Sequence, residues 1–282
     1  MNNVDPRTFR LAAVDLDGTL LGPDNRVSDE NKDALRRLQV GGASVVLASG
    51  RHYQSILPYA REIPGVAWIL SAQGGEVSDI ERKTVLFQHF LERSVAQRAF
   101  ALGQQHGFSV VIYGVDDVFV STDDQGGPFY ANLSGHIPKR RPAALLFDRD
   151  IFKIVWIGEK VRIDNLTTLS ALDDLVATKV RTHQKIFEIL PPNVSKGVGM
   201  AALAGHLGIS TADAVAFGDA ENDIPLFEWA GVSVAMPHGW PTAQRHATAI
   251  GPEGPPETAL ARAVDLALSG SLESQPKKAK IA

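Results

Sequence analysis

The chain has 282 residues, no cysteine, and 28 basic against 32 acidic residues, which gives a formal net charge of −4. The lack of cysteine excludes disulfides, thiolate nucleophiles and cysteine-ligated metal clusters, and the slightly acidic balance argues against nucleic acid as a partner. Residues 1–10 contain no apolar signal-peptide core, and no stretch approaches the ~18 apolar residues of a membrane span. We therefore expect a cytoplasmic protein without a membrane partner.

The first and last parts of the chain alternate short apolar runs with amphipathic segments. Strands buried on both faces read as continuous apolar runs, and the spacers are long enough for crossover helices, so this rhythm predicts a parallel sheet. The predicted strands are 11–14, 44–48, 66–70, 215–217, 232–235 and 248–250, and three of the predicted helices are 53–62, 196–207 and 257–268. Another helix follows Ser28 as its N-cap and ends before Gly41.

The middle of the chain has a different pattern. Between about Thr84 and Leu190 the apolar runs are β-rich, and several are separated by turns too short for crossover helices, which favours an antiparallel sheet. These runs are 110–113, 117–121, 152–157, 178–182 and 187–190. The sequence therefore predicts an α/β core of residues 1–83 and 191–270, an inserted α+β domain of residues 84–190, and a polar, frayed tail at 271–282.

Two carboxylates follow the first predicted strand, in the segment 15–20, which reads Asp-Leu-Asp-Gly-Thr-Leu. In an open parallel sheet, ligands bind beyond the carboxyl ends of the strands, so Asp15 and Asp17 would face solvent and substrate. Asp, Gly and Thr are also common turn formers, and an ordinary turn is the alternative interpretation.

Two further segments could bind an anion. Ser49, Gly50 and Arg51 close the second predicted strand, where a hydroxyl and backbone N–H groups suit a phosphate oxygen, and a helix cap is the alternative. Lys196 stands in the first turn of a predicted helix, where a cation opposes the helix dipole and costs stability unless an anion lies nearby. A solvated lysine is the alternative there.

The segment 218–223 reads Gly-Asp-Ala-Glu-Asn-Asp and follows another predicted strand. Asp219 fits a hard divalent cation, which takes carboxylates, water and substrate phosphate as ligands, while an Asx-turn is the alternative. Four carboxylates at the strand ends would repel a phosphate dianion by several kcal/mol at an effective dielectric of about 20. They belong to Asp15, Asp17, Asp219 and Asp223. A divalent metal together with Lys196 would bring the site near neutrality, so the sequence predicts a phosphoryl-binding site.

In this order, the four segments resemble motifs I to IV of the haloacid dehalogenase (HAD) superfamily, over about residues 11–268. Three features are similar to the Cof-type subfamily with a C2B cap: the position and length of the insert, the segment 188–191 (Glu-Ile-Leu-Pro) and the segment 234–236 (Val-Ala-Met). The resemblance implies a Rossmann-like core with a parallel sheet and an inserted α+β cap.

The resemblance also implies a magnesium-dependent phosphatase of small phosphorylated metabolites, sugar phosphates first. Asp15 would be the nucleophile that forms an aspartyl-phosphate, and Asp17 the general acid and then the general base. Mg²⁺ would be held by Asp15, the backbone carbonyl of Asp17 and Asp219, with Asp223 as a ligand or beside it. The expected phosphate contacts, among which Ser49 and Lys196 are also expected to act in catalysis, are Ser49, Gly50, Arg51, Lys196 and Asn222.

The chain departs from the Cof-type pattern at two places. It has Gln-Gly-Gly at 73–75 where Asn-Gly-Ala is usual, and Pro-His-Gly-Trp at 237–240 where Asn-Ala is usual. Both segments lie at the pocket edge in the family, so they leave the core chemistry intact and leave the substrate open. Four further side chains could contact substrate, although we interpret each as a solvated residue. They are His238, Lys153, Arg181 and His183.

Other functions could use the same motifs. A phosphomutase or phosphotransferase would keep water away from the phospho-enzyme, and a sensor would bind a phosphorylated metabolite without turnover. Asp15 beside Asp17 favours catalysis, because binding alone needs no nucleophile next to an acid. The sequence leaves the oligomeric state open between a monomer and a weak dimer.

Overall fold

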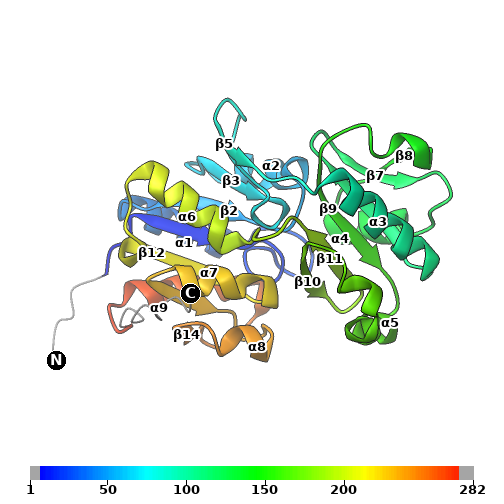
Figure 1. Cartoon of the computed structure of the whole chain (residues 1–282). Helices are drawn as coiled ribbons and strands as arrows, with labels where there is room; N and C mark the ends of the chain where they lie inside the picture. Colours follow the sequence, from blue (N-terminus) through cyan, green and yellow to red (C-terminus); the bar gives the residue numbers. More distant parts are fainter. Residues whose placement is uncertain (1–6, 273–282) are drawn as a thin grey trace.

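The computed structural model describes residues 7–272, apart from the side chains of Thr167 and Thr168, and it contains two β-sheets (Figure 1). The larger sheet has eight strands in the order β14-β13-β12-β1-β2-β3-β4-β5, and the smaller has six in the order β10-β11-β9-β6-β7-β8. In this described part of the chain, no helix is both long and apolar enough to cross a membrane.

Six neighbouring strands of the larger sheet run parallel, as the alternating pattern predicts. They are β1 (Leu11–Val14), β2 (Ser44–Ala48), β3 (Trp68–Ser71), β12 (Ala214–Gly218), β13 (Val232–Ala235) and β14 (Ala249–Ile250). The antiparallel hairpin of β4 (Glu76–Asp79) and β5 (Val85–Gln88), which the sequence interpretation missed, extends this sheet beyond β3. The predicted boundary between residues 83 and 84 falls inside that hairpin.

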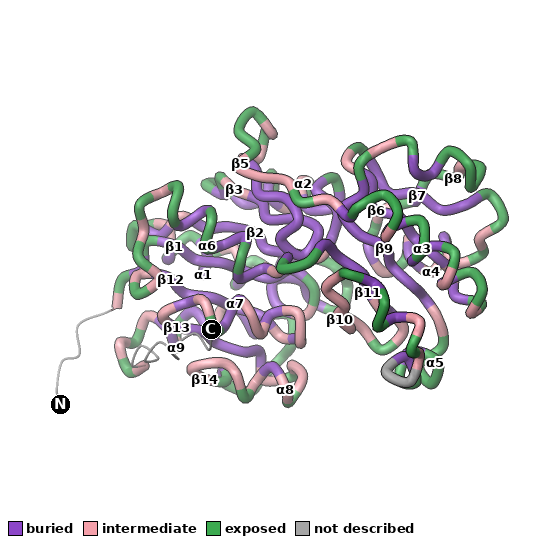
Figure 2. The backbone as a smooth tube through the Cα atoms, in the orientation of Figure 1, coloured by how far each residue is buried: buried purple, intermediate pink, exposed green. Residues whose placement is uncertain are grey.

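Helices cover both faces of the larger sheet because each strand sends alternate side chains to opposite faces. From β1, Ala12 and Val14 join one apolar cluster, and Leu11 and Ala13 join the other. The first cluster includes α1 (Asp29–Val40), α2 (Tyr53–Glu62) and α9 (Ala259–Leu268); the second includes α6 (Lys196–Leu207), α7 (Ile224–Trp229) and the short α8 (Pro241–Gln244). Figure 2 shows the strands as the buried centre of this layered body.

The inserted segment forms the smaller sheet with three helices of its own. The strands are β6 (Ser109–Gly114), β7 (Val118–Ser121), β8 (Lys139–Arg141), β9 (Ile151–Ile157), β10 (Thr178–His183) and β11 (Ile186–Leu190), and the helices are α3 (Arg93–Gln105), α4 (Gly127–Ser134) and α5 (Lys160–Asp164). The pairings are antiparallel as predicted, except that β7 and β8 are parallel. This exception arises because α4 lies between them and provides a crossover connection.

Short 3₁₀ helices fill several connections. They are η1 (Ala72–Gly74), η2 (Ala143–Leu145), η3 (Asn165–Thr168), η4 (Ser170–Leu172), η5 (Thr211–Asp213), η6 (Glu221–Asp223) and η7 (Pro256–Thr258). Two of them, η1 after β3 and η6 after β12, stand at the carboxyl ends of parallel strands, where the site is expected.

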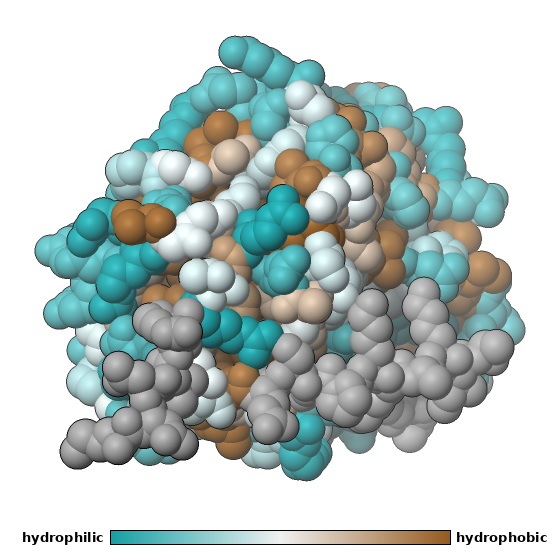
Figure 3. All heavy atoms as spheres, turned by 90° about the vertical axis from the view of Figure 1, so that its left-hand side faces the viewer, coloured by the Kyte–Doolittle hydropathy of each residue, from teal (hydrophilic) through white to brown (hydrophobic). Residues whose placement is uncertain are grey.

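The two faces of the smaller sheet have different partners. Ile154 and Trp156 of β9 pack with α3 and α5, whereas Tyr113, Val155 and Tyr130 of α4 belong to a cluster that also contains Ala72 of the larger body. The second face therefore turns toward the larger sheet. On the side of the molecule drawn in Figure 3, hydrophobic side chains are scattered among hydrophilic ones.

We call the larger sheet with its helices the core and residues 89–190 the cap, and this division is our proposal. The predicted frayed tail falls almost wholly on residues 273–282, which lie outside the described residues. The cap and the core meet where the carboxyl ends of the parallel strands lie, so the candidate site is at their junction.

Candidate active site

A cavity of about 280 Å³ lies between the strand ends of the core and the inner face of the cap. Asp15, Asp17 and Asp219 line it from the core, and Tyr113, His183 and Glu188 line it from the cap. The parallel pairing of β1 with both β2 and β12 brings the first, second and fourth motif segments to the same sheet edge. Tertiary structure thus gathers segments that are about 200 residues apart in sequence.

Lys196 ties two carboxylates together in the floor of this site. Its side chain is fully buried at the start of α6, and its Nζ donates to Oδ1 of Asp15 and, at 2.6 Å, to Oδ1 of Asp223. Burial lowers the pKa of Lys196, but the two carboxylates outweigh burial and raise the pKa above its usual value. The alternative of a solvated lysine is therefore wrong, since these anions compensate the unfavourable helix dipole.

Asp223 shapes the loop that carries Asp219. Its Oδ2 accepts hydrogen bonds from the backbone N–H groups of Asp219 at 3.0 Å and Ala220 at 3.1 Å. A Cβ atom on Gly218 would lie 2.5 Å from the Asp223 carboxyl carbon, so only glycine leaves room for this loop. Both oxygens of Asp223 therefore already accept hydrogen bonds, Oδ1 from Lys196 and Oδ2 from the loop. We propose that Asp223 lies next to the metal ion or shares one of these oxygens with it.

Three carboxylates form a cluster that fits a divalent cation. Oxygen atoms of Asp15, Asp219 and Asp223 lie within 4.8 Å of one another, and Oδ1 of Asp219 is enclosed without a hydrogen-bond partner among the described residues. Burial and the neighbouring carboxylates raise the pKa of Asp15 to about 8, although Lys196 opposes this shift, and they also raise the pKa of Asp219. A cluster of oxygen donors with an unpaired buried oxygen matches the preference of Mg²⁺.

Gly18 allows the first and fourth motif segments to approach each other. Its φ is +78°, a conformation that favours glycine, and an added Cβ would lie 2.6 Å from Oδ2 of Asp219. The glycine of the Asp-x-Asp-Gly segment therefore serves the site directly, in addition to making a turn.

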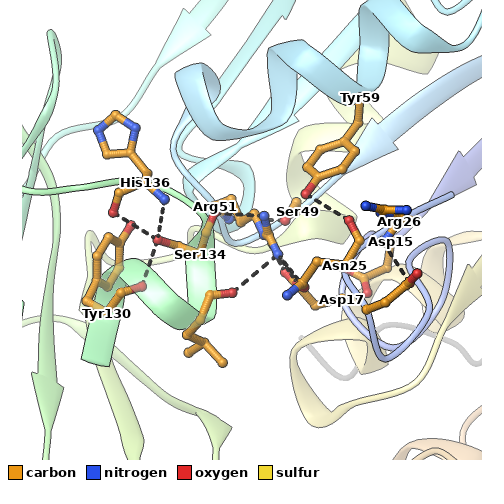
Figure 4. A network of polar contacts seen from close by, with 12 residues as sticks. Asp15, Asp17, Asn25, Arg26, Ser49, Arg51, Tyr59, Tyr130, Ser134 and His136 are labelled. Atoms are coloured by element: carbon orange, nitrogen blue, oxygen red, sulfur yellow. Dashed lines mark hydrogen bonds and ion pairs between the residues drawn. The ribbon is translucent and has the colours of Figure 1, made fainter. Parts of the chain in front are cut away.

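Asp17 forms a bidentate ion pair with Arg51 (Figure 4). The guanidinium donates to the two carboxylate oxygens of Asp17 at 2.9 and 2.5 Å, and it also donates to the backbone carbonyl of Ser134 at 2.8 Å. Ser134 is the last residue of α4, where a cation is favourable. Arg51 thus links the proposed general acid to the cap, and its predicted contact with phosphate stays a prediction.

Ser49 is fully buried at the end of β2. Its Oγ accepts a hydrogen bond from the backbone N–H of Arg51 at 3.1 Å, which holds the turn at Gly50. A hydroxyl that accepts in this way can still donate its proton to an anion. The helix-cap alternative for Ser49 is wrong, because His52 is the N-cap of α2 and accepts from the Gln54 N–H at 3.3 Å, and the phosphate contact of Ser49 stays a prediction.

A chain of polar side chains, buried except for the half-buried Asn222, crosses from the core to the cap. Asn222 donates to Oε1 of Gln73 at 3.1 Å, and Gln73 donates to Oε2 of Glu188 at 3.0 Å. Oε1 of Glu188 accepts from Nζ of Lys153 at 2.7 Å, and the same Nζ donates to the Gly50 carbonyl at 2.7 Å. In the structure, the Asn222 amide supports this chain beside the site. Its predicted contact with phosphate stays a prediction.

The sequence interpretation gave Glu188 no role, placed the segment of Gln73 at the pocket edge without a contact, and was wrong to interpret Lys153 as solvated, since this side chain is 0% exposed. A signal was present: Lys153 and Glu188 each interrupt an otherwise apolar run that forms a strand. Lys and Glu are almost never fully buried unless they are paired. Opposite charges in two such strands therefore indicate an ion pair.

The mouth of the cavity lies beside the 237–240 segment. Trp240 lines the cavity, and the guanidinium carbon of Arg181 from the cap lies 5.7 Å from the centre of its ring. Arg181 and His183 are both half-buried rather than solvated, and burial lowers the pKa of His183. His238 is exposed, with its Nε2 2.8 Å from the Gly18 carbonyl, as expected of a surface residue.

Comparisons with known proteins agree with this geometry. A family model described as haloacid dehalogenase-like hydrolase matches residues 12–261. The HMP-PP phosphatase of Cronobacter sakazakii is 27% identical over 242 residues, which are 82% of this chain and 85% of that protein. A haloacid dehalogenase-like hydrolase structure from Bacteroides thetaiotaomicron has a TM-score of 0.77 at 24% identity, covering 92% of this chain and 99% of that one. Another from B. subtilis has a TM-score of 0.81 at 22% identity, covering 91% and 99%.

Proposed function

Because this chain belongs to the haloacid dehalogenase-like hydrolases and is a phosphatase of that family, we propose that it uses Mg²⁺ to hydrolyse small phosphorylated metabolites through an aspartyl-phosphate. The observation that carries this proposal is that Asp15, Asp17 and Asp219 line one cavity, with the buried Lys196 bonded to Asp15. A nucleophile, an acid, a buried cation and a metal-binding cluster are the parts that phosphoryl transfer requires.

In the proposed reaction, a carboxylate oxygen of Asp15 attacks phosphorus while Asp17 gives a proton to the departing alcohol oxygen. Asp17 then takes a proton from the water that attacks the aspartyl-phosphate, and phosphate leaves as Asp15 is restored. We expect Ser49 and Lys196 to stabilise the negative charge of the phosphoryl oxygens. When bound by Asp15, Asp219 and the Asp17 carbonyl, Mg²⁺ would neutralise charge in the carboxylate cluster.

Sugar phosphates are the expected substrate class because the cap side of the cavity is polar. The hydroxyl groups of Tyr113 and Tyr130 lie 2.7 Å apart, and Glu188 and His183 line the same space. The tyrosine hydroxyls and the imidazole of His183 can bond to the hydroxyl groups of a small alcohol, whereas both oxygens of Glu188 are already engaged by Lys153 and Gln73. The volume of about 280 Å³ is near the lower limit for ligand pockets, which favours a small metabolite.

A phosphate-release screen tests this function. We expect release from one or more sugar phosphates in Mg²⁺, loss of activity in EDTA, and recovery when Mg²⁺ is restored in excess. Nucleotides, polyol phosphates and HMP-PP, for which the relative is named, complete the panel, and Asp15→Asn is the inactive control.

Four outcomes would overturn parts of the proposal. Full activity in EDTA with metal content confirmed as zero would exclude the metal role, and equal phosphate release by folded Asp15→Asn would exclude the nucleophile. A burst of alcohol without net phosphate release would indicate a phosphotransferase or phosphomutase. Binding without turnover across the whole panel would indicate a sensor.

A further inference from the structure

We propose that Lys153, held in place by Glu188, is a positioning residue that couples the seating of the cap to the geometry of the turn 49–51. The proposal rests on the proposed function, because it assigns this turn to the phosphoryl group. It concerns a contact between a cap side chain and a core backbone atom, and it gives the cap a part in building the phosphate site.

The contact is enclosed on all sides. Lys153 lies on β9, and its ammonium has three neighbours: Glu188 Oε1 at 2.7 Å, the Gly50 carbonyl at 2.7 Å, and the Tyr113 ring centre at 4.2 Å. Lys153 is 0% exposed and Glu188 is 5% exposed. These atoms belong to the cap except for the Gly50 carbonyl, so this hydrogen bond exists only when the cap is seated on the core.

Lys153 acts on one end of a rigid unit whose other end is also held. The Gly50 carbonyl and the Arg51 N–H belong to the same planar peptide group, and that N–H donates to Oγ of Ser49 at 3.1 Å. Fixing the carbonyl through Lys153 therefore fixes the direction of the N–H and, through it, the Ser49 hydroxyl. The cap lysine thereby orients the side chain proposed to bind the phosphoryl group without touching it.

The same ion pair reaches the fourth motif segment. Glu188 accepts from Gln73 and Gln73 accepts from Asn222, which lies in η6 between Asp219 and Asp223. A Cβ on Gly50 would lie 2.3 Å from Nε2 of Gln73, so the turn and this amide are packed against each other. One buried pair in the cap thus contacts the turn 49–51 directly and reaches the fourth motif segment through Gln73.

A stability role alone explains the pair poorly. Burying two charges costs desolvation that well-packed apolar residues would avoid, and the best-attested use of such groups is to set one register. The pair is also formally neutral, so it does not act by attracting an anionic substrate over distance. A role in fixing the position of the cap relative to Gly50 accounts both for the burial of the two charges and for the neutrality of the pair.

The test is the double variant Lys153→Met with Glu188→Gln, which removes the contact to Gly50 without leaving a buried unpaired charge. Lys160→Met is the matched control, since this cap lysine is 56% exposed and pairs with Asp164 within the cap. In the full chain with Mg²⁺, we expect kcat/KM to fall about 10–100-fold, which is the loss typical when a residue that hydrogen-bonds to a metal ligand is replaced. The loss should be equal for substrates with different alcohols, and inorganic phosphate should bind more weakly by calorimetry, while the control stays at the wild-type values.

Wild-type phosphate affinity and wild-type kcat/KM in the folded double variant would overturn the proposal. A loss that differs strongly between alcohols would overturn it too, because it would make Lys153 a specificity residue. If the double variant does not fold, Lys153→Gln combined with Glu188→Gln decides: the amide at position 153 is one bond shorter than lysine, so it can bond to the amide at position 188 but not to Gly50 as well, and the same losses are expected. Calorimetry with phosphate needs no turnover, so it tests positioning even if the proposed function fails.

Discussion

Replacing Asp219 with asparagine should make the metal-free protein more stable while it abolishes the response to Mg²⁺. Oxygen atoms of Asp219, Asp15 and Asp223 lie within 4.8 Å of one another, and Lys196 supplies one positive charge bonded to the other two carboxylates. Without a metal, an ionised Asp219 carboxylate would be repelled by two anions and attracted by one cation, and the protons that these raised-pKa carboxyls retain instead also cost free energy at pH 8. Asp219→Asn removes this net repulsion and keeps the shape of the side chain.

The magnitude follows from the distances. One pair of unit charges within 4.8 Å of each other interacts by at least about 3 kcal/mol at an effective dielectric of 20. Because the attraction to Lys196 cancels roughly one of the two repulsions, one such pair remains. Asp219 is only partly buried, so solvent screening reduces the effect, and we expect a gain of about 1–3 kcal/mol in the free energy of unfolding.

Urea unfolding in EDTA at pH 8, followed by circular dichroism, measures this gain. Added Mg²⁺ should then stabilise the wild type, by about 2.7 kcal/mol at a hundredfold excess over Kd, and should leave Asp219→Asn nearly unchanged. Asp123→Asn, at an exposed position in the cap, is the control and should change neither quantity. An Asp219→Asn protein that is no more stable than the wild type in EDTA would refute this electrostatic argument.

The pH dependence of the metal-free wild type tests the same cluster. Burial and the neighbouring carboxylates raise the pKa of Asp15 from 3.8 to about 8, so between these values the folded state binds more protons than the unfolded state. Stability should therefore fall as the pH rises from about 4 to about 8 in EDTA, and the fall should be smaller in Mg²⁺. A metal-free wild type as stable at pH 8 as at pH 5 would contradict the raised pKa.

Three further substitutions probe the site. Asp15→Asn should lower phosphate release more than ~10³-fold with an intact fold, and a folded variant with a smaller loss would argue against the covalent route. Lys196→Met should raise KM, lower kcat and destabilise the fold by about 3–5 kcal/mol, because it leaves two buried carboxylates unpaired. Urea unfolding measures the change in stability, and the additional substitution Asp223→Asn should recover part of the lost stability. Arg51→Met removes donors to Asp17 and to the Ser134 carbonyl, so we expect about 1–3 kcal/mol lower stability and a lower kcat/KM, whereas unchanged kinetics would deny the link between acid and cap.

Local sequence determined the core elements and the four motif segments, because the signals for them are short in range. A continuous apolar run identifies a buried strand such as β2, and Ser28 followed by an apolar stripe identifies α1, since capping and periodicity are properties of neighbouring residues. The acidic segments after β1 and β12 were recognisable for the same reason. The hairpin of β4 and β5 was not, because its exposed edge carries a weaker apolar pattern.

Tertiary structure alone decided which side chains meet. Lys153 and Glu188 are 35 residues apart in sequence and Gln73 is 115 residues from Glu188, so their contacts depend on strand register within the cap and on where the cap sits. The partners of Arg51 were likewise decided by the fold. Its sequence context predicted a phosphate contact, whereas in the structure it lies between Asp17 and the end of α4. The partner of a buried charge is chosen by packing over long distances in the chain, which no local pattern records.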